Sequence, residues 1–186
     1  RPLFLMKGYL MQPLYYDVAV SADGFIAGAN EDVSRFPHTG PIVDAYFERL
    51  STYAVAVMGA ETYRFGLKHG LPLGANPYPK MRTIVLSKKL EVPENSEISV
   101  SGDAAADVVA GLKDTAEGPI YLCGGGRLAA CLLSAGLITA LRLKRAPVLL
   151  GQGVSLFEGP LPAPELRLVS QNSYADGTLF QELSIV

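Results

Sequence analysis

Three consecutive glycines mark the part of this chain where a phosphate group is best accommodated. They interrupt the sequence IYLCGGGRLAACLL, which starts at residue 120, between an apolar run and an amphipathic segment. Glycine lets a strand turn sharply into a helix and lets a ligand approach the backbone closely. The leading N–H groups of the helix would then face the ligand, and the helix dipole favours an anion there. A flexible turn that binds nothing is the alternative, because glycine-rich motifs are common.

Two further motifs follow predicted strands in the same way as the glycines. Met58 and Gly59 end one apolar run, and Ser87 and Lys88 end another. The carboxyl ends of parallel strands meet at one edge of a sheet, so the three motifs are expected to line one crevice. The fingerprint G-x-G-x-x-G with an acidic residue about twenty positions later is absent, so an ordinary Rossmann domain is not predicted.

The elements that position these motifs alternate between strands and helices along the middle of the chain. The pattern predicts strands at 15–21, 25–27, 53–58, 82–87, 98–100, 120–122, 139–145, 166–174 and 178–185. Helices are predicted to open at Pro41 (with Val43, Tyr46, Phe47 and Leu50 on one face) and to span 61–65, 104–113 and 128–135. Asp103 is expected to cap the third helix and Gly136 to end the fourth. This order predicts an α/β three-layer sandwich with a largely parallel central sheet and an antiparallel C-terminal edge hairpin.

Length and composition indicate one globular domain. The chain has 186 residues, 49% of them hydrophobic and 18% charged, with a formal net charge of −2. This charge gives no electrostatic footprint for nucleic acid, and the apolar runs are too short to span a membrane. The domain is expected to span 11–186, with 1–10 as an extension. Met6 and Met11 are both candidates for the natural start, and Met11 is favoured because the periodic pattern begins immediately after it.

The cysteines and histidines favour neither a disulfide nor a metal site. Cys123 and Cys131 form no CxxC motif and are predicted to be reduced thiols, as in a cytoplasmic protein. His38 and His69 are isolated and have no second ligand at the spacing that metals require.

Five segments together resemble the dihydrofolate reductase superfamily. They are SADGFIAG (21–28), VMGAETY (57–63), IVLSKKL (84–90), IYLCGGGRLAACLLSAGLI (120–138) and PVLLGQGVSLF (147–157). They are most similar to the reductase domain of the bifunctional riboflavin-biosynthesis deaminase/reductase and to its stand-alone bacterial relatives. The resemblance implies a dihydrofolate-reductase-like fold and hydride transfer from NADPH, with NADH as the less favoured cofactor. The implied substrate is a small heterocycle, either the 5-amino-6-(5-phosphoribosylamino)uracil of the riboflavin pathway or a pterin- or folate-like ring.

The resemblance also implies which residues contact the cofactor. Gly124, Gly125, Gly126 and Arg127 would hold the pyrophosphate, with Leu128 at the same helix start and a cis peptide bond between Gly124 and Gly125. Thr62 would donate to the pyrophosphate from a second helix N-terminus, where Gly59 allows close approach. Leu86, Ser87 and Lys88 would flank the adenosine, and Ala27 would lie near the nicotinamide.

Two positions depart from the family pattern. Ala60 stands where the family usually has an arginine that contacts cofactor phosphate, which weakens the case for NADP. Lys88 offers a replacement cation, so NADPH is expected to bind more tightly than NADH by a modest margin. Thr139 and Ala140 replace a common Asp-Glu pair, a change that bears on the dimer surface or the substrate edge.

Of two aspartates considered for catalysis, Asp44 is the candidate and Asp23 is assigned a structural role. Asp44 lies where dihydrofolate reductases carry a substrate-binding acid, and desolvation beside Phe47 would suit it to proton donation. The alternative is an exposed acid in a first helical turn, which the helix dipole favours. Asp23 is assigned to a turn, because Asp-Gly is a strong turn signal.

The partner expected from the resemblance is a second copy of the chain. Leu141, Leu143 and the strand 179–185 have the alternation of an apolar surface that a homodimer would bury, although the same alternation suits the domain's own core. Two other functions stay open at this point. One is a non-catalytic nucleotide-binding protein of the same fold, and the other is a structural α/β domain that binds no ligand.

Overall fold

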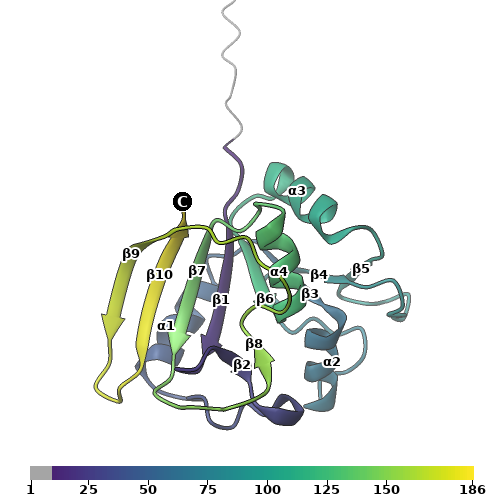
Figure 1. The fold of residues 1–186 in the computed structure, drawn as a ribbon. Coiled ribbons are helices and arrows are strands. Elements are labelled where there is room, and N and C mark those ends of the chain that lie inside the picture. The colour runs from purple at the N-terminus through teal and green to yellow at the C-terminus, as the bar shows by residue number, and fades with distance from the viewer. Residues whose placement is uncertain (1–9) are drawn as a thin grey trace, which may run out of the picture.

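A twisted eight-stranded sheet forms the centre of the molecule (Figure 1). The computed structural model describes residues 10–186, so most of the extension expected at 1–10, with Met6, lies outside the described residues. Six neighbouring strands are parallel, and the last two are antiparallel. Across the sheet the order is β5 (Ser99–Ser101), β4 (Arg82–Leu86), β3 (Val55–Gly59), β6 (Ile120–Gly124), β1 (Leu14–Val20), β7 (Ala140–Arg145), β10 (Leu179–Ile185) and β9 (Leu166–Ser173).

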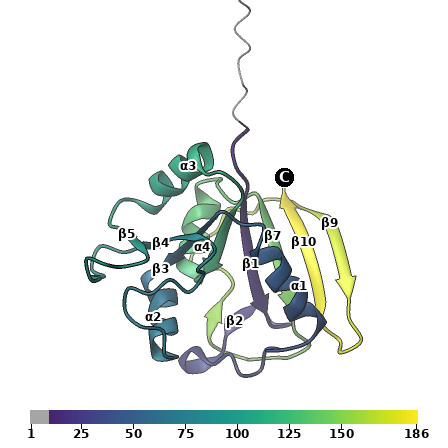
Figure 2. The same ribbon diagram turned by 180° about the vertical axis from the view of Figure 1, so that it is seen from behind.

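Helices cover both faces of the parallel strands and complete the predicted three layers (Figures 1 and 2). One face carries α1 (Pro41–Leu50) and α2 (Ala60–Lys68), and the other carries α3 (Ala105–Thr115) and α4 (Gly126–Ser134). A 3-10 turn, Ala29–Glu31, follows β1 and β2 (Phe25–Ala27). The strand β2 pairs with β8 (Val154–Ser155) in a separate two-stranded sheet, which the sequence pattern did not predict.

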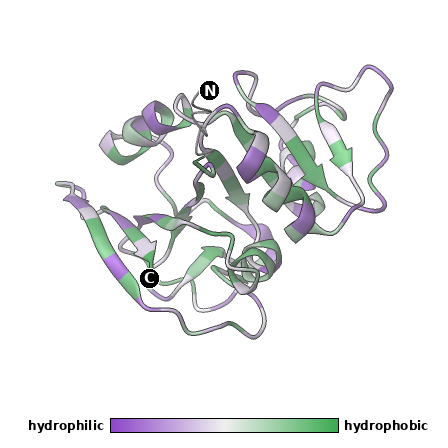
Figure 3. Cartoon of the chain, turned by 90° about the horizontal axis from the view of Figure 1, so that it is seen from above, coloured by the Kyte–Doolittle hydropathy of each residue, from purple (hydrophilic) through white to green (hydrophobic). Residues whose placement is uncertain are grey.

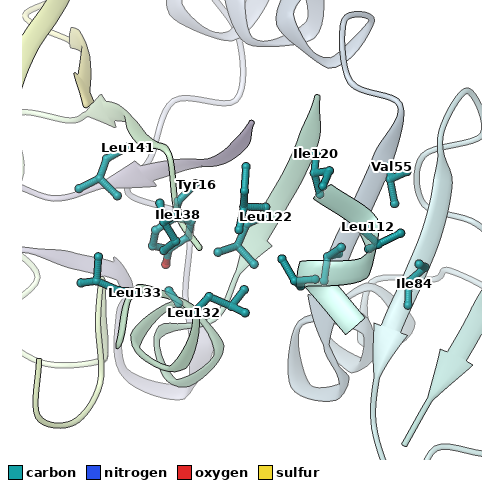
Figure 4. Close-up of a cluster of buried hydrophobic side chains, with 14 of the residues drawn as sticks. Tyr16, Val55, Ile84, Leu112, Ile120, Leu122, Leu132, Leu133, Ile138 and Leu141 are labelled. Atoms are coloured by element: carbon teal, nitrogen blue, oxygen red, sulfur yellow. The ribbon is translucent and has the colours of Figure 1, made fainter. Parts of the chain in front are cut away.

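The apolar strands are buried because each contacts helices on both of its faces. In β3, Val55 and Val57 pack toward α3 and α4, whereas Ala56 and Met58 pack toward α1 and α2. Figure 4 shows Leu132 of α4 meeting side chains of the sheet in the larger of these cores. Hydrophobic residues concentrate on the central strands, and hydrophilic ones on the loops and outer helix faces (Figure 3).

Two of the predicted helix details are wrong. Asp103 does not cap α3: the N-cap is Ala104, while the Asp103 N–H donates to Ser101 Oγ at 3.3 Å. In α1, Tyr46 and Leu50 pack against the core as predicted and Ile42 is buried, but Phe47 is 62% exposed and does not share this face. Gly136 ends α4 as predicted, with a φ of 68° that favours glycine.

The C-terminal hairpin forms the predicted antiparallel edge, and none of the helices within residues 10–186 covers its outer strand (Figures 1 and 2). Leu141 and Leu143 of β7 are buried in the domain's own core, so they cannot supply a dimer surface as expected. The exposed apolar side chains lie instead on β9, at Leu166, Leu168 and Val169. The homodimer itself stays a prediction from the family resemblance, which the mass of the protein in solution would test.

Candidate active site

Two cavities adjoin at the carboxyl ends of the parallel strands. The first, the glycine cavity, has a volume of about 660 Å³, and its walls include Ala27, Gly59, Thr62 and residues Gly124 to Leu128. The second, the aromatic cavity, has a volume of about 420 Å³, and its walls include Phe36, Tyr46, Phe47, Phe65, Tyr121 and Lys144. Five residues line both cavities: Val18, Ile26, Val33, Phe65 and Cys123. Molecules bound in the two cavities would therefore meet at this shared wall.

The glycine cavity brings together most of the residues expected to contact a cofactor. Ala27, Gly59, Thr62 and the stretch from Gly124 to Leu128 all line it, although they come from three separate parts of the chain. Leu86, Ser87 and Lys88 do not line it, because they end β4, the strand beyond β3. The Ser87 hydroxyl instead accepts the N–H groups of Lys89 and Leu90 at 3.2 and 3.0 Å.

Each of the three consecutive glycines has a different structural environment, which explains what a side chain would do at that position. Gly124 has a φ of 127°, which favours glycine, and its peptide bond to Gly125 is cis, which confirms that prediction. A Cβ at Gly125 would meet only Thr62 Oγ1 at 3.6 Å, so this position leaves room beside the cavity. A Cβ at Gly126 would collide with the carbonyl oxygen of Ser155, so the close approach of β8 already requires a glycine at this position.

Two helices begin at the glycine cavity with no side chain capping their first turns. The N-caps are Gly59 for α2 and Gly125 for α4, and neither makes a side-chain capping hydrogen bond. The leading N–H groups of a helix need acceptors, and an anion satisfies them together with the helix dipole. Two such ends at one cavity match the two phosphates of a pyrophosphate, so the residues present fit a dinucleotide cofactor.

The charged side chains around the glycine cavity are ion-paired. The carboxylate of Glu158 lies 3.5 Å from Arg127, whose side chain is 91% exposed. Two more carboxylates of the lining pair with neighbouring cations, Glu31 with Lys68 and Glu61 with Arg64. Because these carboxylates are neutralised, an incoming anion would meet the helix ends without strong repulsion.

A buried carboxylate, Asp17, lies at the floor of the aromatic cavity, and the sequence analysis did not single it out. Its side chain is 0% exposed and accepts hydrogen bonds from Arg49 Nε and Lys144 Nζ, each at 2.9 Å. Arg49 also donates from Nη2 at 3.1 Å, and the Tyr53 hydroxyl donates a fourth hydrogen bond at 2.9 Å. Burial alone would raise the pKa of Asp17, but Lys144 and Arg49 hold this pKa below its ordinary value.

Strand pairing explains how these groups meet. Asp17 of β1 stands beside Arg142 of β7 in register, with Lys144 two residues further along that strand. Arg49 reaches them from α1, which lies over these strands in Figure 2. A signal was present in the sequence: Asp17 interrupts an otherwise apolar strand, and two cations alternate on the strand that pairs with it.

Tyrosines and a thiol give the aromatic cavity a neutral polar wall. The hydroxyls of Tyr46 and Tyr121 lie 2.6 Å apart, and the Tyr121 ring stacks on Tyr53 with 5.1 Å between centroids. Burial raises the pKa of Cys123 to about 12, and that of Tyr121 well above its ordinary value. These groups are therefore uncharged at neutral pH.

Asp44, the candidate acid, and Asp23, the predicted turn residue, both lie outside the cavities. Asp44 is exposed in the first turn of α1 and lines neither cavity, which agrees with the alternative of an acid favoured by the helix dipole. Asp23 accepts the Ser21 hydroxyl at 2.6 Å and the Gly151 N–H at 2.7 Å, and these bonds lower its pKa to about 2. Asp23 thus joins the predicted turn to the loop that precedes β8.

The two departures from the family pattern lie in different places. Ala60 lines the glycine cavity, so the arginine that the family usually has would stand in the candidate site itself. Thr139 lies at the opposite end of the sheet, where its hydroxyl accepts the Leu14 N–H at 3.0 Å and Lys113 Nζ at 3.2 Å. Its contacts are with the domain's own core rather than with the substrate edge.

Two findings bear on metal binding and membranes. Among residues 10–186, no group of three or more His, Cys, Asp and Glu side chains is placed to hold a metal ion. Within the same residues, every helix is too short or too polar to cross a membrane.

Comparisons with known proteins agree with this geometry. The model of the RibD C-terminal domain family matches residues 13–180. The uncharacterized protein YyaP of Bacillus subtilis (strain 168) is 25% identical over 174 residues, which cover 88% of this chain and 89% of that protein.

Solved structures share the fold. A putative riboflavin biosynthesis protein from Shewanella sp. PV-4 has a TM-score of 0.78 at 22% identity, over 94% of this chain and 99% of that one. A diaminohydroxyphosphoribosylaminopyrimidine deaminase/5-amino-6-(5-phosphoribosylamino)uracil reductase from Thermotoga maritima has a TM-score of 0.70 at 13% identity, over 95% of this chain and 57% of that one. A pyrimidine reductase-like protein from Corynebacterium diphtheriae has a TM-score of 0.69 at 16% identity, over 94% and 92%.

Proposed function

Because this chain belongs to the RibD C-terminal domain family, we propose that it is an oxidoreductase that reduces a small heterocyclic compound with NADPH. The observation that carries the proposal is the pair of uncapped helix N-termini at one cavity, those of α2 and α4. The adjoining aromatic cavity supplies flat apolar walls of the kind that hold a ring.

The residues of the glycine cavity divide the task of holding the cofactor. The N–H groups that follow Gly59 and Gly125 would bind the two phosphates, and the Thr62 hydroxyl would donate to one of them. Bound nicotinamide supplies the hydride. The protein's own contribution is to orient the two rings at the shared wall, near Val18 and Cys123, and to keep water out with apolar side chains.

A non-catalytic nucleotide-binding protein of the same fold is the second candidate, and Ala60 is the observation that favours it. The two functions differ in one measurement, the oxidation of NADPH in the presence of heterocyclic compounds. Oxidation that depends on the added compound supports the reductase. Cofactor binding without oxidation by any compound of a broad set supports the second candidate.

Replacing Thr62 by valine is expected to weaken the binding of NADPH and NADH alike, by about ten- to a hundredfold. Valine keeps the shape of the side chain but removes the hydroxyl, and a hydrogen bond to a charged group contributes about 1.5–3 kcal/mol. Titration of the nicotinamide fluorescence measures both dissociation constants. Thr62→Ser keeps the donor and should bind like the wild type, whereas equal affinity of the valine variant would remove Thr62 from the site.

Replacing Lys88 by alanine is expected to weaken NADPH binding by about tenfold and to leave NADH binding unchanged. The two cofactors differ by one 2′-phosphate, and a single exposed cation acts on it as a point charge. Lys88 is exposed at the end of β4, beside the strand that leads into the glycine cavity. Lys89→Ala is the matched control, and equal wild-type affinities for the two cofactors would contradict the prediction.

A further inference from the structure

Two tyrosine hydroxyls face each other at the wall of the aromatic cavity. The hydroxyls of Tyr46 and Tyr121 lie 2.6 Å apart, and both residues line the cavity. Tyr121 is 3% exposed, whereas Tyr46 on α1 is half-buried, so Tyr46 is the member of the pair that a ligand reaches first. When Tyr121 donates within the pair, the Tyr46 hydroxyl keeps its own hydrogen for a ligand in the cavity.

The tyrosine pair lies close to the place where the two cavities join. Tyr121 and Cys123 are two residues apart on β6, so their side chains leave the same face of the strand, and Cys123 lines both cavities. Tyr78 packs edge-on against Tyr121 with 5.4 Å between ring centroids, and its hydroxyl interacts with Tyr121 and Cys123. Tyr78 is half-buried in the loop between α2 and β4 and lines neither cavity. A row of polar groups thus leads from this loop to the shared wall.

Cations outnumber the carboxylate around the Tyr46 ring. The Lys144 ammonium lies 3.6 Å from the ring centroid, and the Arg49 guanidinium lies 6.0 Å from it. Both cations share the single carboxylate of Asp17. The excess of positive charge would stabilise a phenolate on Tyr46. Burial raises the pKa of Tyr46, so its hydroxyl is protonated at neutral pH and can serve as an acid toward the stronger base that a hydride acceptor becomes.

We propose that Tyr46 is the proton donor of the reduction and that Tyr121 replaces the proton that Tyr46 gives up. The proposal rests on the proposed function, in which a nicotinamide in the glycine cavity supplies a hydride to the carbon of a C=N or C=O group. The π electrons of that group move to its nitrogen or oxygen, which takes the Tyr46 proton. One hydride and one proton are added in all, and NADPH leaves as NADP⁺. Tyr121 then donates to the Tyr46 phenolate, and Tyr78 passes a proton from solvent to Tyr121.

His38 is the main alternative donor in this cavity. It is exposed, and it also lines a separate hollow at the surface together with Lys68 and His69, which places it at the outer rim. Tyr46 is held by Tyr121 and interacts with Cys123 of the shared wall. Because the proton is needed where the hydride arrives, this position favours Tyr46 over His38.

The test compares NADPH oxidation by the full chain and its variants, with 7,8-dihydrofolate, lumazine and 5-amino-6-(5-phosphoribosylamino)uracil as acceptors. Tyr46→Phe keeps the ring and removes the hydroxyl, and it is expected to slow oxidation by about 100- to 10,000-fold. Titration of the nicotinamide fluorescence should show unchanged NADPH binding, because Tyr46 does not line the glycine cavity. His38→Gln should slow oxidation far less. Tyr15→Phe is the matched control, since Tyr15 lines neither cavity, and should oxidise NADPH like the wild type.

Added acid separates proton donation from a structural role. Ammonium in the buffer should restore part of the rate of Tyr46→Phe in proportion to its concentration and leave the wild type unchanged. Tyr121→Phe keeps the donor but removes the hydroxyl behind it, and should slow oxidation by about tenfold.

The outcomes distinguish this proposal from the proposed function. Wild-type oxidation by Tyr46→Phe, a loss that ammonium does not restore, or an equal loss in His38→Gln overturns Tyr46 as the donor while the reductase function stands. A loss of NADPH binding in Tyr46→Phe indicates a structural role and overturns it as well. Absence of oxidation by the wild type with every acceptor overturns both proposals.

Discussion

Replacement of Asp17 by alanine is expected to lower the free energy of unfolding by about 3–5 kcal/mol, because it leaves buried cations without their counterion. The Asp17 side chain is fully buried, and the charged groups of Arg49 and Lys144 that contact it are only 17% and 13% exposed. The hydroxyl of Tyr53 loses its acceptor as well. Urea unfolding followed by circular dichroism measures the loss.

Asp44→Asn is the matched control, since Asp44 is an exposed acid on α1 and its replacement should change stability by less than about 0.5 kcal/mol.

The stabilising effect of Asp17 should also depend on pH. The partners of Asp17 lower its pKa in the folded protein, so its stabilising contribution is present above the ordinary carboxyl range and is lost as the pH falls below it. Wild type and Asp17→Ala should therefore converge in acid. A loss below 1 kcal/mol at neutral pH would show that the network contributes little.

Gly153→Ala is expected to destabilise the protein by about 2–5 kcal/mol, through two effects that act together. Its φ of 137° is strained for any residue with a Cβ. A Cβ at this position would also collide with the carbonyl oxygen of Ala27 and lie 2.7 Å from backbone atoms of Gly28. Because the collision is with backbone, no side-chain rotation relieves it. Thermal or urea unfolding measures the change.

Gly151→Ala separates the backbone strain from the collision, because Gly151 lies in the same loop and also has a positive φ, but has no close neighbour. Gly151 has a φ of 76°, but an added Cβ would meet nothing within 4 Å. This variant should cost only about 1–2 kcal/mol, the usual cost of a left-handed residue with a Cβ. Equal costs at Gly151 and Gly153 would show that the close approach to β2 does not matter.

The parts of the structure that depend on local pattern were predictable from the sequence. The buried strands, the turn at Gly136 and the glycines after β6 follow from residues close together in the chain, and these predictions agree with the structure. The family resemblance added the cis bond at Gly124, which local pattern alone does not reveal.

The parts that depend on distant residues were missed. Asp17 meets Arg49 across 32 residues and Lys144 across 127, so no window of sequence contains the network. Strand β8 has two residues and exists only because β2 pairs with it. Local partners can also be hidden from sequence patterns: Ser87 was expected beside the adenosine, and the structure adds that its hydroxyl accepts the N–H groups of Lys89 and Leu90, while its contact with a cofactor stays a prediction.

The pairing of β2 with β8 has a consequence for the order of folding. It joins Phe25 to Ser155, and the loop that follows β8 packs against Gly126 at the start of α4. The glycine cavity is therefore closed by segments that are far apart in sequence, and contacts of this kind form late because closing a long loop costs chain entropy. During synthesis, the glycine cavity is therefore incomplete until β8 has left the ribosome. A ligand that binds in the complete cavity would stabilise the molecules in which β2 and β8 are already paired.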